Sequence, residues 1–338
     1  MRKPVVLITG ASGEIGHGLI TRLTEKKTRS VITLDLKPLP PDLEPKIAQH
    51  FPGSILDEQL LERILVEFEI DLIFHLAALL STRSEFAPLT AHRVNVEGTM
   101  AMLEHAQRQG ETHGRPVTFV YPSSIAAYGL PDLKTKEATP RIAESLYNQP
   151  TTMYGCNKLY CEQMGRYYFH YYKQLSAEKM SGKVDFRCIR FPGLISGVTI
   201  PSGGTSDYAS EMIHAAAKGE AYQCFVRPDT RIPFMVMPDA IDSLMKLALA
   251  PRESLSQTVY NIGAFKPSAE EIETIVRQAF PNSQIETKVE EKRQAIVDTW
   301  PAGVDDSAAR RDWDHGPQFD LTKGFEDYLI PTITELYR

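Results

Sequence analysis

Short apolar runs and longer amphipathic stretches alternate along the first 190 residues of the chain. The apolar runs are rich in β-branched residues and predict five strands, at Val5–Thr9, Val31–Asp35, Asp71–Leu76, Val117–Tyr121 and Asp185–Arg190. Apolar positions with helical spacing predict four helices between them, at Glu14–Glu25, Glu58–Phe68, Ala91–Gln109 and Thr152–Gln174. Near-continuous apolar strands that alternate with helices are typical of βαβ units, whose parallel sheet is covered on both faces. The pattern therefore predicts an α/β fold with a doubly wound parallel sheet.

A glycine-rich turn joins the first predicted strand to the first predicted helix. Its sequence is Gly10-Ala-Ser-Gly13-Glu-Ile-Gly16. A side chain at the glycines would obstruct the tight turn, the approach of a pyrophosphate to the backbone, and the packing of helix against strand. Plain turns also contain such glycines, but the position directly after the first strand favours a Rossmann dinucleotide site with the pyrophosphate at the helix N-terminus.

An acidic residue ends the second predicted strand. Asp35 lies 19 residues after Gly16, where a carboxylate accepts hydrogen bonds from an adenosine ribose. A carboxylate there repels the 2′-phosphate of NADP, so the sequence predicts NAD as the cofactor. Lys37 weakens this preference slightly, because its ammonium group could approach such a phosphate, and a solvated acid at a strand end remains the alternative for Asp35.

The pattern changes after Arg190. Prolines and glycines punctuate the following loop, a helical pattern surrounds Tyr208–Ala217, and short elements separated by turn residues follow. We interpret this part as a smaller α+β region over the carboxyl edge of the sheet. The predicted organisation is a dinucleotide-binding domain at residues 1–190, with return elements near 235–258, and a substrate-binding or lid region at 191–234 and 259–338.

Composition and charge exclude several classes of partner. The 338-residue chain carries 37 basic and 43 acidic residues, a net charge of −6, which argues against nucleic-acid binding because phosphate neutralisation needs a basic surface. No apolar run approaches the ~18 residues of a transmembrane helix, so no membrane partner is expected. The four cysteines form no C-x-x-C pair and lie far from any histidine cluster, which predicts a reducing, cytoplasmic location and no metal site.

One predicted helix carries a tyrosine and a lysine on the same face. Tyr154 and Lys158 are four residues apart, and Ser123-Ser124 follow a strand at the edge where ligands bind in open α/β sheets. A phenol with a pKa of about 10 is a poor base at neutral pH, but a fixed cation and a bound nicotinamide cation stabilise its phenolate. A serine hydroxyl then orients the substrate oxygen. Tyrosine and lysine at this spacing are common by chance; their order after the glycine turn and Asp35 favours catalysis.

Together these residues resemble the extended short-chain dehydrogenase/reductase superfamily. The shared features are the glycine turn, Asp35, His75-Leu76-Ala77-Ala78, Asn95, Ser124, Tyr154 and Lys158. Further motifs are similar to the short-chain type of L-threonine 3-dehydrogenases, at His75–Ser81, Pro122–Ala126, Phe191–Ser196, Gly203–Ala209, Met235–Ala240 and Arg293–Pro301. This resemblance spans nearly the full chain. The chain departs from the pattern of these dehydrogenases at Ser206, at Val236 and in an insertion-like stretch at Ser176–Gly182.

The resemblance implies NAD-dependent oxidation of the β-hydroxyl of L-threonine to 2-amino-3-oxobutyrate. It implies Tyr154 as general base, Lys158 as its partner and ribose ligand, and Ser124 as the group that holds the substrate hydroxyl. The implied substrate contacts are Ser81, Thr205, Asp207 and Trp300. The implied cofactor contacts are Gly10, Gly13, Glu14, Ile15, Gly16, Asp35, Leu36, Leu76, Ala77, Ala78, Asn95, Tyr154, Lys158 and Leu194. A homodimer formed through the helices at Ala91–Gln109 and Thr152–Gln174 is also expected.

Other interpretations of these residues stay open. Asp207 suits a substrate ammonium group, yet it also suits a helix cap before Tyr208, and Trp300 is either a lid residue or core. Dehydratases of the superfamily carry an acid pair where this chain has Ile125 and Ala126, so elimination is not expected. A nucleotide-sugar epimerase is the first alternative, although the second region shows no basic cluster for a diphosphate. A non-catalytic NAD-binding sensor is the second alternative.

Overall fold

The computed structural model describes residues 4–25, 29–176, 182–201 and 203–338. A seven-stranded parallel sheet has the order β10-β6-β5-β4-β1-β2-β3. Its strands are β1 (Val5–Thr9), β2 (Ser30–Asp35), β3 (Gln49–Pro52), β4 (Ile70–His75), β5 (Val117–Ser124), β6 (Val184–Phe191) and β10 (Val259–Asn261). The order reverses between β1 and β4, as in a doubly wound Rossmann sheet. The predicted fold class and all five predicted strands are confirmed. Most of the insertion-like stretch at Ser176–Gly182 lies outside the described residues.

The two edge strands were not predicted. β3 buries only Phe51 fully and consists otherwise of Gln49, His50 and Pro52, so its sequence lacks a strand-like apolar run. β10 has three residues and pairs with β6 from Val259 to Asn261. It lies in the range 259–338 that the sequence analysis gives to the smaller region, but its hydrogen bonds make it part of the sheet.

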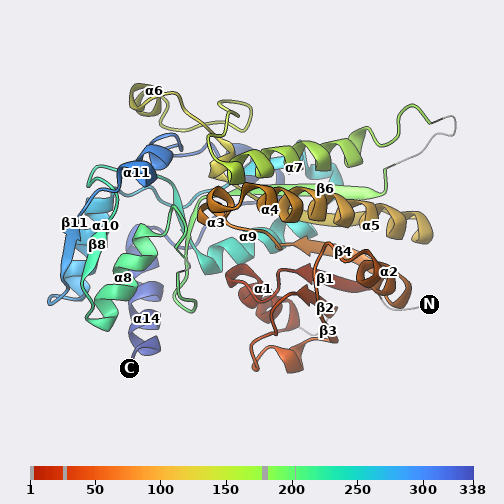
Figure 1. Cartoon of the computed structure of the whole chain (residues 1–338), viewed down its shortest axis with the longest axis horizontal. Helices are drawn as coiled ribbons and strands as arrows, with labels where there is room; N and C mark the ends of the chain where they lie inside the picture. The colour runs from red at the N-terminus through yellow and green to blue at the C-terminus, as the bar shows by residue number, and fades with distance from the viewer. Residues whose placement is uncertain (1–3, 26–28, 177–181, 202) are drawn as a thin grey trace.

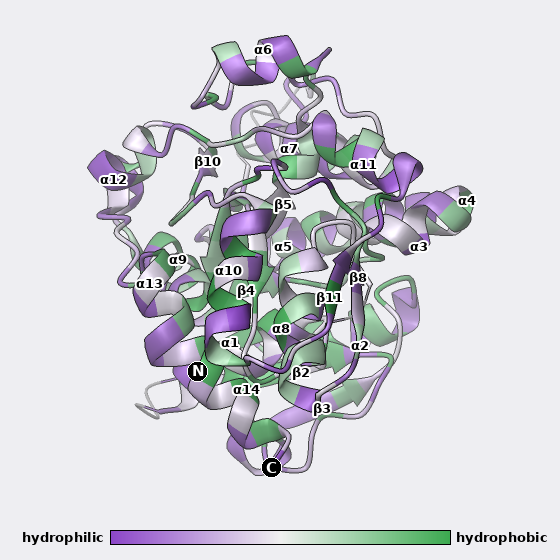
Figure 2. Cartoon of the chain, turned by 90° about the vertical axis from the view of Figure 1, so that its left-hand side faces the viewer, coloured by the Kyte–Doolittle hydropathy of each residue, from purple (hydrophilic) through white to green (hydrophobic). Residues whose placement is uncertain are grey.

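Helices cover both faces of the sheet, because alternate strand residues point to opposite sides. On one face, Val6 and Ile8 pack with α1 (Glu14–Thr24) and α9 (Met237–Leu249). On the other face, Leu7 packs in a cluster with residues of the remaining helices. Those helices are α2 (Glu58–Glu67), α5 (Gly98–His113) and α7 (Met153–His170). Figure 1 shows α5 and α7 side by side along that face, and in Figure 2 the green hydrophobic positions gather at the centre of the molecule.

A smaller region lies at one end of the sheet, on the left in Figure 1. Its helices are α8 (Tyr208–Lys218), α10 (Ala269–Ala279), α11 (Glu291–Asp298) and α14 (Ile330–Leu336), and its strand pairs are β8 (Tyr222–Cys224) with β11 (Ile285–Thr287) and β7 (Gly193–Ile195) with β9 (Phe234–Val236). One buried apolar cluster holds these elements together, and Tyr154 of α7 packs against it. The smaller region therefore shares a boundary with the helix that carries the candidate catalytic residues.

Short elements connect these layers. They are η1 (Glu44–Lys46), α3 (Ser81–Phe86), α4 (Pro88–His92), η2 (Arg93–Glu97), η3 (Ile125–Ala127), α6 (Leu133–Ala138), η4 (Arg252–Ser254), α12 (Ser307–Trp313), α13 (Leu321–Lys323) and η5 (Gly324–Leu329). The helix predicted at Ala91–Gln109 is thus continuous from α4 through η2 to α5. Within the described residues, none of the helices has the length and apolar character needed to cross a membrane.

Candidate active site

The glycine turn has the geometry that a dinucleotide site needs. Gly10 has a φ of +69°, and a Cβ there would lie 2.5 Å from the backbone nitrogen of Ala77. A Cβ on Gly16 would lie 2.3 Å from the carbonyl oxygen of Ala11, so this glycine allows the start of α1 to pack on the turn. The exposed Gly13 would bring its Cβ no closer than 3.3 Å to Gly10, which leaves the helix N-terminus accessible. These features fit a bound pyrophosphate.

Asp35 closes the same turn at the end of β2. One carboxylate oxygen accepts a hydrogen bond from the backbone nitrogen of Ser12 at 2.9 Å, and the other accepts one from the backbone nitrogen of Lys37 at 2.9 Å. Both bonds hold the carboxylate beside the glycine turn, and its remaining lone pairs are available to ribose hydroxyls. Leu36 next to it is 76% exposed, so its side chain is available to a ligand.

The segment after β4 is held by Asn95. The side chain of Asn95 accepts from the backbone nitrogen of Leu79 at 2.7 Å and donates to its carbonyl oxygen at 3.1 Å. It also donates to Asn157 of α7 at 3.3 Å, which connects Leu79, directly after the predicted cofactor segment Leu76–Ala78, to the helix of Tyr154. Asn157 was not predicted. His75 is a core residue: Thr9 and Thr99 bond its two ring nitrogens, and burial lowers its pKa to about 3.

The structure brings Ser124, Tyr154 and Lys158 to one place. Ser124 ends β5, and its hydroxyl accepts from the backbone nitrogen of Ala126 at 3.1 Å. A Cβ on Gly155 would lie 2.0 Å from the carbonyl oxygen of Ala126, so the turn of α7 that carries Tyr154 touches the residues after Ser124. Lys158 donates from Nζ to the carbonyl oxygen of Pro122 at 2.6 Å. The helix is therefore fixed to the end of β5 on both sides of Ser124.

Burial acts against charge on both members of the tyrosine–lysine pair. Desolvation raises the pKa of Tyr154 above its ordinary value, which is the wrong direction for a base. Burial lowers the pKa of Lys158 to about 8, although the nearby Glu162 carboxylate raises it. The Lys158 nitrogen lies 5.4 Å from the centre of the Tyr154 ring and 4.6 Å from that of Tyr121. A phenolate on Tyr154 therefore depends on a positive charge being maintained beside it.

A buried network that the sequence analysis missed supports this pair. Glu162 accepts a hydrogen bond from the hydroxyl of Ser123 at 2.5 Å. It also forms a bidentate ion pair with Arg190, whose Nε and Nη2 donate to the two carboxylate oxygens at 2.9 and 2.6 Å. The side chains of Glu162 and Arg190 are 1% and 3% exposed. Glu162 follows Lys158 by four residues on the same helix face, and that spacing was the available signal.

The predicted substrate residues approach one another from the two regions. The hydroxyl and backbone nitrogen of Thr205 both bond the Ser81 hydroxyl, at 3.2 and 3.3 Å. Asp207 occupies the N-cap position of α8, yet its side chain does not cap that helix. It accepts instead from the backbone nitrogen of Gly204 at 2.6 Å. Burial, and to a smaller extent the charge of Asp207, raise the pKa of Glu14 to about 7.

Comparison with known proteins places the chain among its relatives. Residues 6–263 match the NAD dependent epimerase/dehydratase family. The chain is 35% identical over 316 residues to the mitochondrial L-threonine 3-dehydrogenase of Bos taurus. The aligned part covers 94% of this chain and 79% of that protein. The chain belongs to the NAD dependent epimerase/dehydratase family.

Solved structures of two kinds are similar to this member of the epimerase/dehydratase family. One is described as a monomeric L-threonine 3-dehydrogenase from a metagenome database, in its apo form, with a TM-score of 0.86 and 34% identity over 99% of this chain and 100% of that one. The other is a UDP-glucose 4-epimerase from Thermotoga maritima, with a TM-score of 0.81 and 19% identity over 98% and 99% of the two chains. The second likeness extends to the fold alone.

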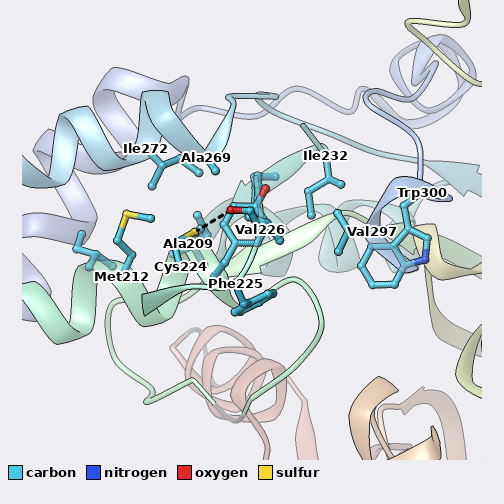
Figure 3. Close-up of a cluster of buried hydrophobic side chains, with 14 of the residues drawn as sticks. Ala209, Met212, Cys224, Phe225, Val226, Ile232, Ala269, Ile272, Val297 and Trp300 are labelled. Carbon is cyan, nitrogen blue, oxygen red and sulfur yellow. Dashed lines mark hydrogen bonds between the residues drawn. The ribbon is translucent and has the colours of Figure 1, made fainter. Parts of the chain in front are cut away.

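Three further predicted site residues of this epimerase/dehydratase family member lie in apolar surroundings. Trp300 is 3% exposed and lies at one end of the buried cluster drawn in Figure 3, beyond Val297, while its indole nitrogen has no hydrogen-bond partner among the described residues. Leu194 of β7 and Ile15 of α1 are half-buried and pack against the cluster on the α1–α9 side of the sheet. In the described ranges, no group of three histidine, cysteine or acidic side chains is placed to hold a metal ion.

Proposed function

We propose that the protein is an NAD-dependent dehydrogenase that oxidises the β-hydroxyl of L-threonine to 2-amino-3-oxobutyrate. The observation that supports this proposal is the attachment of α7, which carries Tyr154 and Lys158, to the end of β5 on both sides of Ser124. The named relatives and the similar solved structures support the same activity. Ile125 and Ala126, which follow Ser124, have no side chain that can exchange protons, so the site does not favour elimination.

Each catalytic residue has a distinct task. Tyr154 accepts the proton of the substrate hydroxyl, and the Lys158 ammonium group stabilises the phenolate. Ser124 donates a hydrogen bond to the substrate oxygen and orients it toward Tyr154. NAD⁺, when bound at Gly10–Gly16 and Asp35, supplies the hydride acceptor and a further positive charge. Glu162 is one of the neighbours that raise the pKa of Lys158 against the effect of burial.

The substrate is recognised by groups that match an amino acid. Asp207 carries the negative charge for the ammonium group, while the hydroxyls of Ser81 and Thr205 form polar contacts. Trp300 closes the apolar side of the site against water, since it lies in the same cluster against which Tyr154 packs. Closure of the smaller region over the amino acid would then complete the site.

Formation of NADH with different substrates tests this function. The protein is incubated with NAD⁺ and L-threonine, D-threonine, L-serine or UDP-galactose, and the absorbance of NADH is followed. We expect a rate with L-threonine that exceeds the other rates by at least about tenfold, because one methyl group or a changed stereocentre alters the fit to Tyr154 and Ser124. Conversion of UDP-galactose without activity on L-threonine would instead establish the epimerase alternative. Tight NAD binding with no turnover would establish the sensor alternative.

A homodimer through α5 and α7 is also part of the proposal. Met100 of α5 and Tyr160, Tyr167 and Tyr171 on or beside α7 are at least 40% exposed, and they would supply the apolar contacts of this interface. Light scattering on the purified protein should give twice the mass of one chain, and Tyr160→Glu should shift the measured mass toward that of a single chain.

Four free thiols, three of them buried, support a reducing compartment such as the cytoplasm. Cell fractionation tests that location.

A further inference from the structure

The segment Gly203–Asp207 is held from both regions of the molecule. From the dinucleotide side, the hydroxyl of Thr82 donates to the carbonyl oxygen of Gly203 at 2.7 Å, and Ser81 bonds Thr205. From the smaller region, Arg293 of α11 donates from Nη2 to the carbonyl oxygen of Gly204 at 2.8 Å. Two successive carbonyl groups are thus held from opposite sides, in the part of the chain that carries the proposed substrate contacts.

We propose that Arg293 is a positioning residue that sets the substrate affinity of the site by fixing Gly204, and through it Asp207. This inference rests on the proposed oxidation of L-threonine. Arg293 is the first residue of the motif Arg293–Pro301, which is similar to a motif of L-threonine 3-dehydrogenases. The resemblance implies a role for Trp300 alone among the residues of this motif. The side chain of Arg293 contacts the loop backbone and is 24% exposed.

The peptide groups of Gly204 connect the arginine to the carboxylate. The carbonyl oxygen of Gly204 accepts from Arg293, and its backbone nitrogen donates to Asp207 at 2.6 Å. A Cβ on Gly204 would lie 2.8 Å from a carboxylate oxygen of Asp207, so the carboxylate packs directly on this residue. Arg293 and Asp207 are therefore bonded to the two peptide groups that flank the Cα of Gly204, and displacement of this residue would move the donor that holds Asp207.

The guanidinium group is fixed on the side away from the loop. Its carbon atom lies 3.2 Å from the centre of the Phe225 ring, and Phe225 is buried and packs edge-on against Tyr208, the residue after Asp207. The nearest acidic partner, Glu290, is 3.9 Å away, which is too far for a hydrogen bond. A planar guanidinium can stack on the ring and donate to Gly204 together, whereas the ammonium of a lysine cannot reproduce both contacts.

Substitution of Arg293 tests the proposal through substrate kinetics. We expect Arg293→Gln to raise KM for L-threonine by about ten- to a hundredfold, the loss typical of a hydrogen bond from a charged group, with kcat changed less than about threefold. Arg293→Lys should recover part of the affinity. The Kd for NAD and the thermal midpoint should match the unchanged protein. An unchanged KM in both variants overturns the proposal.

Arg277→Gln is the matched control. Arg277 of α10 also donates to a backbone carbonyl, that of Ile285, but far along the chain from the loop. This variant should leave KM for L-threonine within about twofold, whereas an increase equal to that of Arg293→Gln shows a general loss of packing and contradicts a specific role. Absence of L-threonine oxidation in the unchanged protein defeats the proposed function itself, which is a separate result.

Two further measurements separate positioning from direct contact. L-threonine amide lacks the carboxylate of L-threonine. If Arg293 acts through Asp207, Arg293→Gln should lower kcat/KM equally for the amide and for L-threonine. A loss confined to L-threonine shows that Arg293 binds the carboxylate directly, and overturns the proposal. In the Asp207→Asn background, Arg293→Gln should have little further effect on kcat/KM, because residues that act as a unit are not additive. Full additivity contradicts the connection through Gly204.

Discussion

The side-chain nitrogen of Lys158 lies 5.4 Å from the centre of the Tyr154 ring, one helical turn along α7. Burial raises the pKa of the tyrosine and lowers that of the lysine to about 8, so desolvation disfavours the charged form of both groups. The Glu162 carboxylate opposes this effect on Lys158. A phenolate on Tyr154 would therefore depend on the positive charge of Lys158, one turn away.

Removal of the Tyr154 hydroxyl should abolish the proton acceptor and little else. We expect Tyr154→Phe to lower kcat by about 10²- to 10⁴-fold, the range of general base catalysis, while the Kd for NAD stays within about twofold. Steady-state kinetics and titration of the cofactor by fluorescence measure the two quantities. Tyr160→Phe, on the exposed side of the same helix, is the control and should retain full activity. A near-normal kcat in Tyr154→Phe contradicts the assigned base.

Loss of the Glu162 charge should destabilise the folded protein strongly. Glu162→Gln leaves Arg190 buried without its anion, and such a change costs about 3–5 kcal/mol of the free energy of unfolding. Glu62→Gln is the matched control, since Glu62 pairs with Arg108 at the surface, where such a pair contributes about 0–1 kcal/mol. Urea denaturation measures both. Equal losses in the two variants contradict the assigned difference.

Asp35 should decide between the two nicotinamide cofactors. Asp35→Ala removes the ribose acceptor and the charge that repels a 2′-phosphate, so the Kd for NAD should rise about tenfold and the preference for NAD over NADP should narrow. Isothermal titration with each cofactor measures this. Asp71 lies at the start of β4, whereas Asp35 lies at the end of β2, so Asp71→Ala should change neither the Kd for NAD nor that for NADP. Tighter binding of NADP than of NAD by the unchanged protein shows that the assignment is wrong.

The stability contribution of Glu14 should depend on pH. Its pKa is raised to about 7, chiefly by burial and further by Asp207. The unfolded carboxyl ionises near pH 4.5 while the folded one keeps its proton to about pH 7, so the folded state loses relative stability as pH rises between these values. The thermal midpoint of Glu14→Gln minus that of the unchanged protein should therefore increase from pH 4.5 to 7 and stay constant above pH 7.

Glu58→Gln provides the control for this pH dependence. Glu58 also occupies the first position of a helix, α2, but is exposed. Comparison of the two variants across the same pH range isolates the part of the pH dependence that arises from the burial of Glu14. A constant difference in thermal midpoint between Glu14→Gln and the unchanged protein would show that Glu14 ionises in the folded protein as it does in the unfolded one.

The pattern along the chain predicted the sheet because each strand repeats one physical requirement. Val5–Thr9 is buried at every residue, as a parallel strand with helices on both faces must be. Such a run identifies itself without knowledge of its neighbours. β3 and β10 offered no such run, because an edge strand needs fewer buried residues and three residues cannot establish a period.

The sequence alone determined the doubly wound sheet, the glycine turn and the spacing of Tyr154 and Lys158, since these features depend on residues close together in the chain. Only the tertiary structure decided that Glu162 pairs with Arg190, that the charge of Asp207 acts on Glu14 and that Arg293 holds Gly204. These partners are separated by 28, 193 and 89 residues, and no local period or turn preference encodes which distant groups meet. Burial then fixes their energetics, because charge and hydrogen bonding acquire their cost or benefit only after water has been excluded.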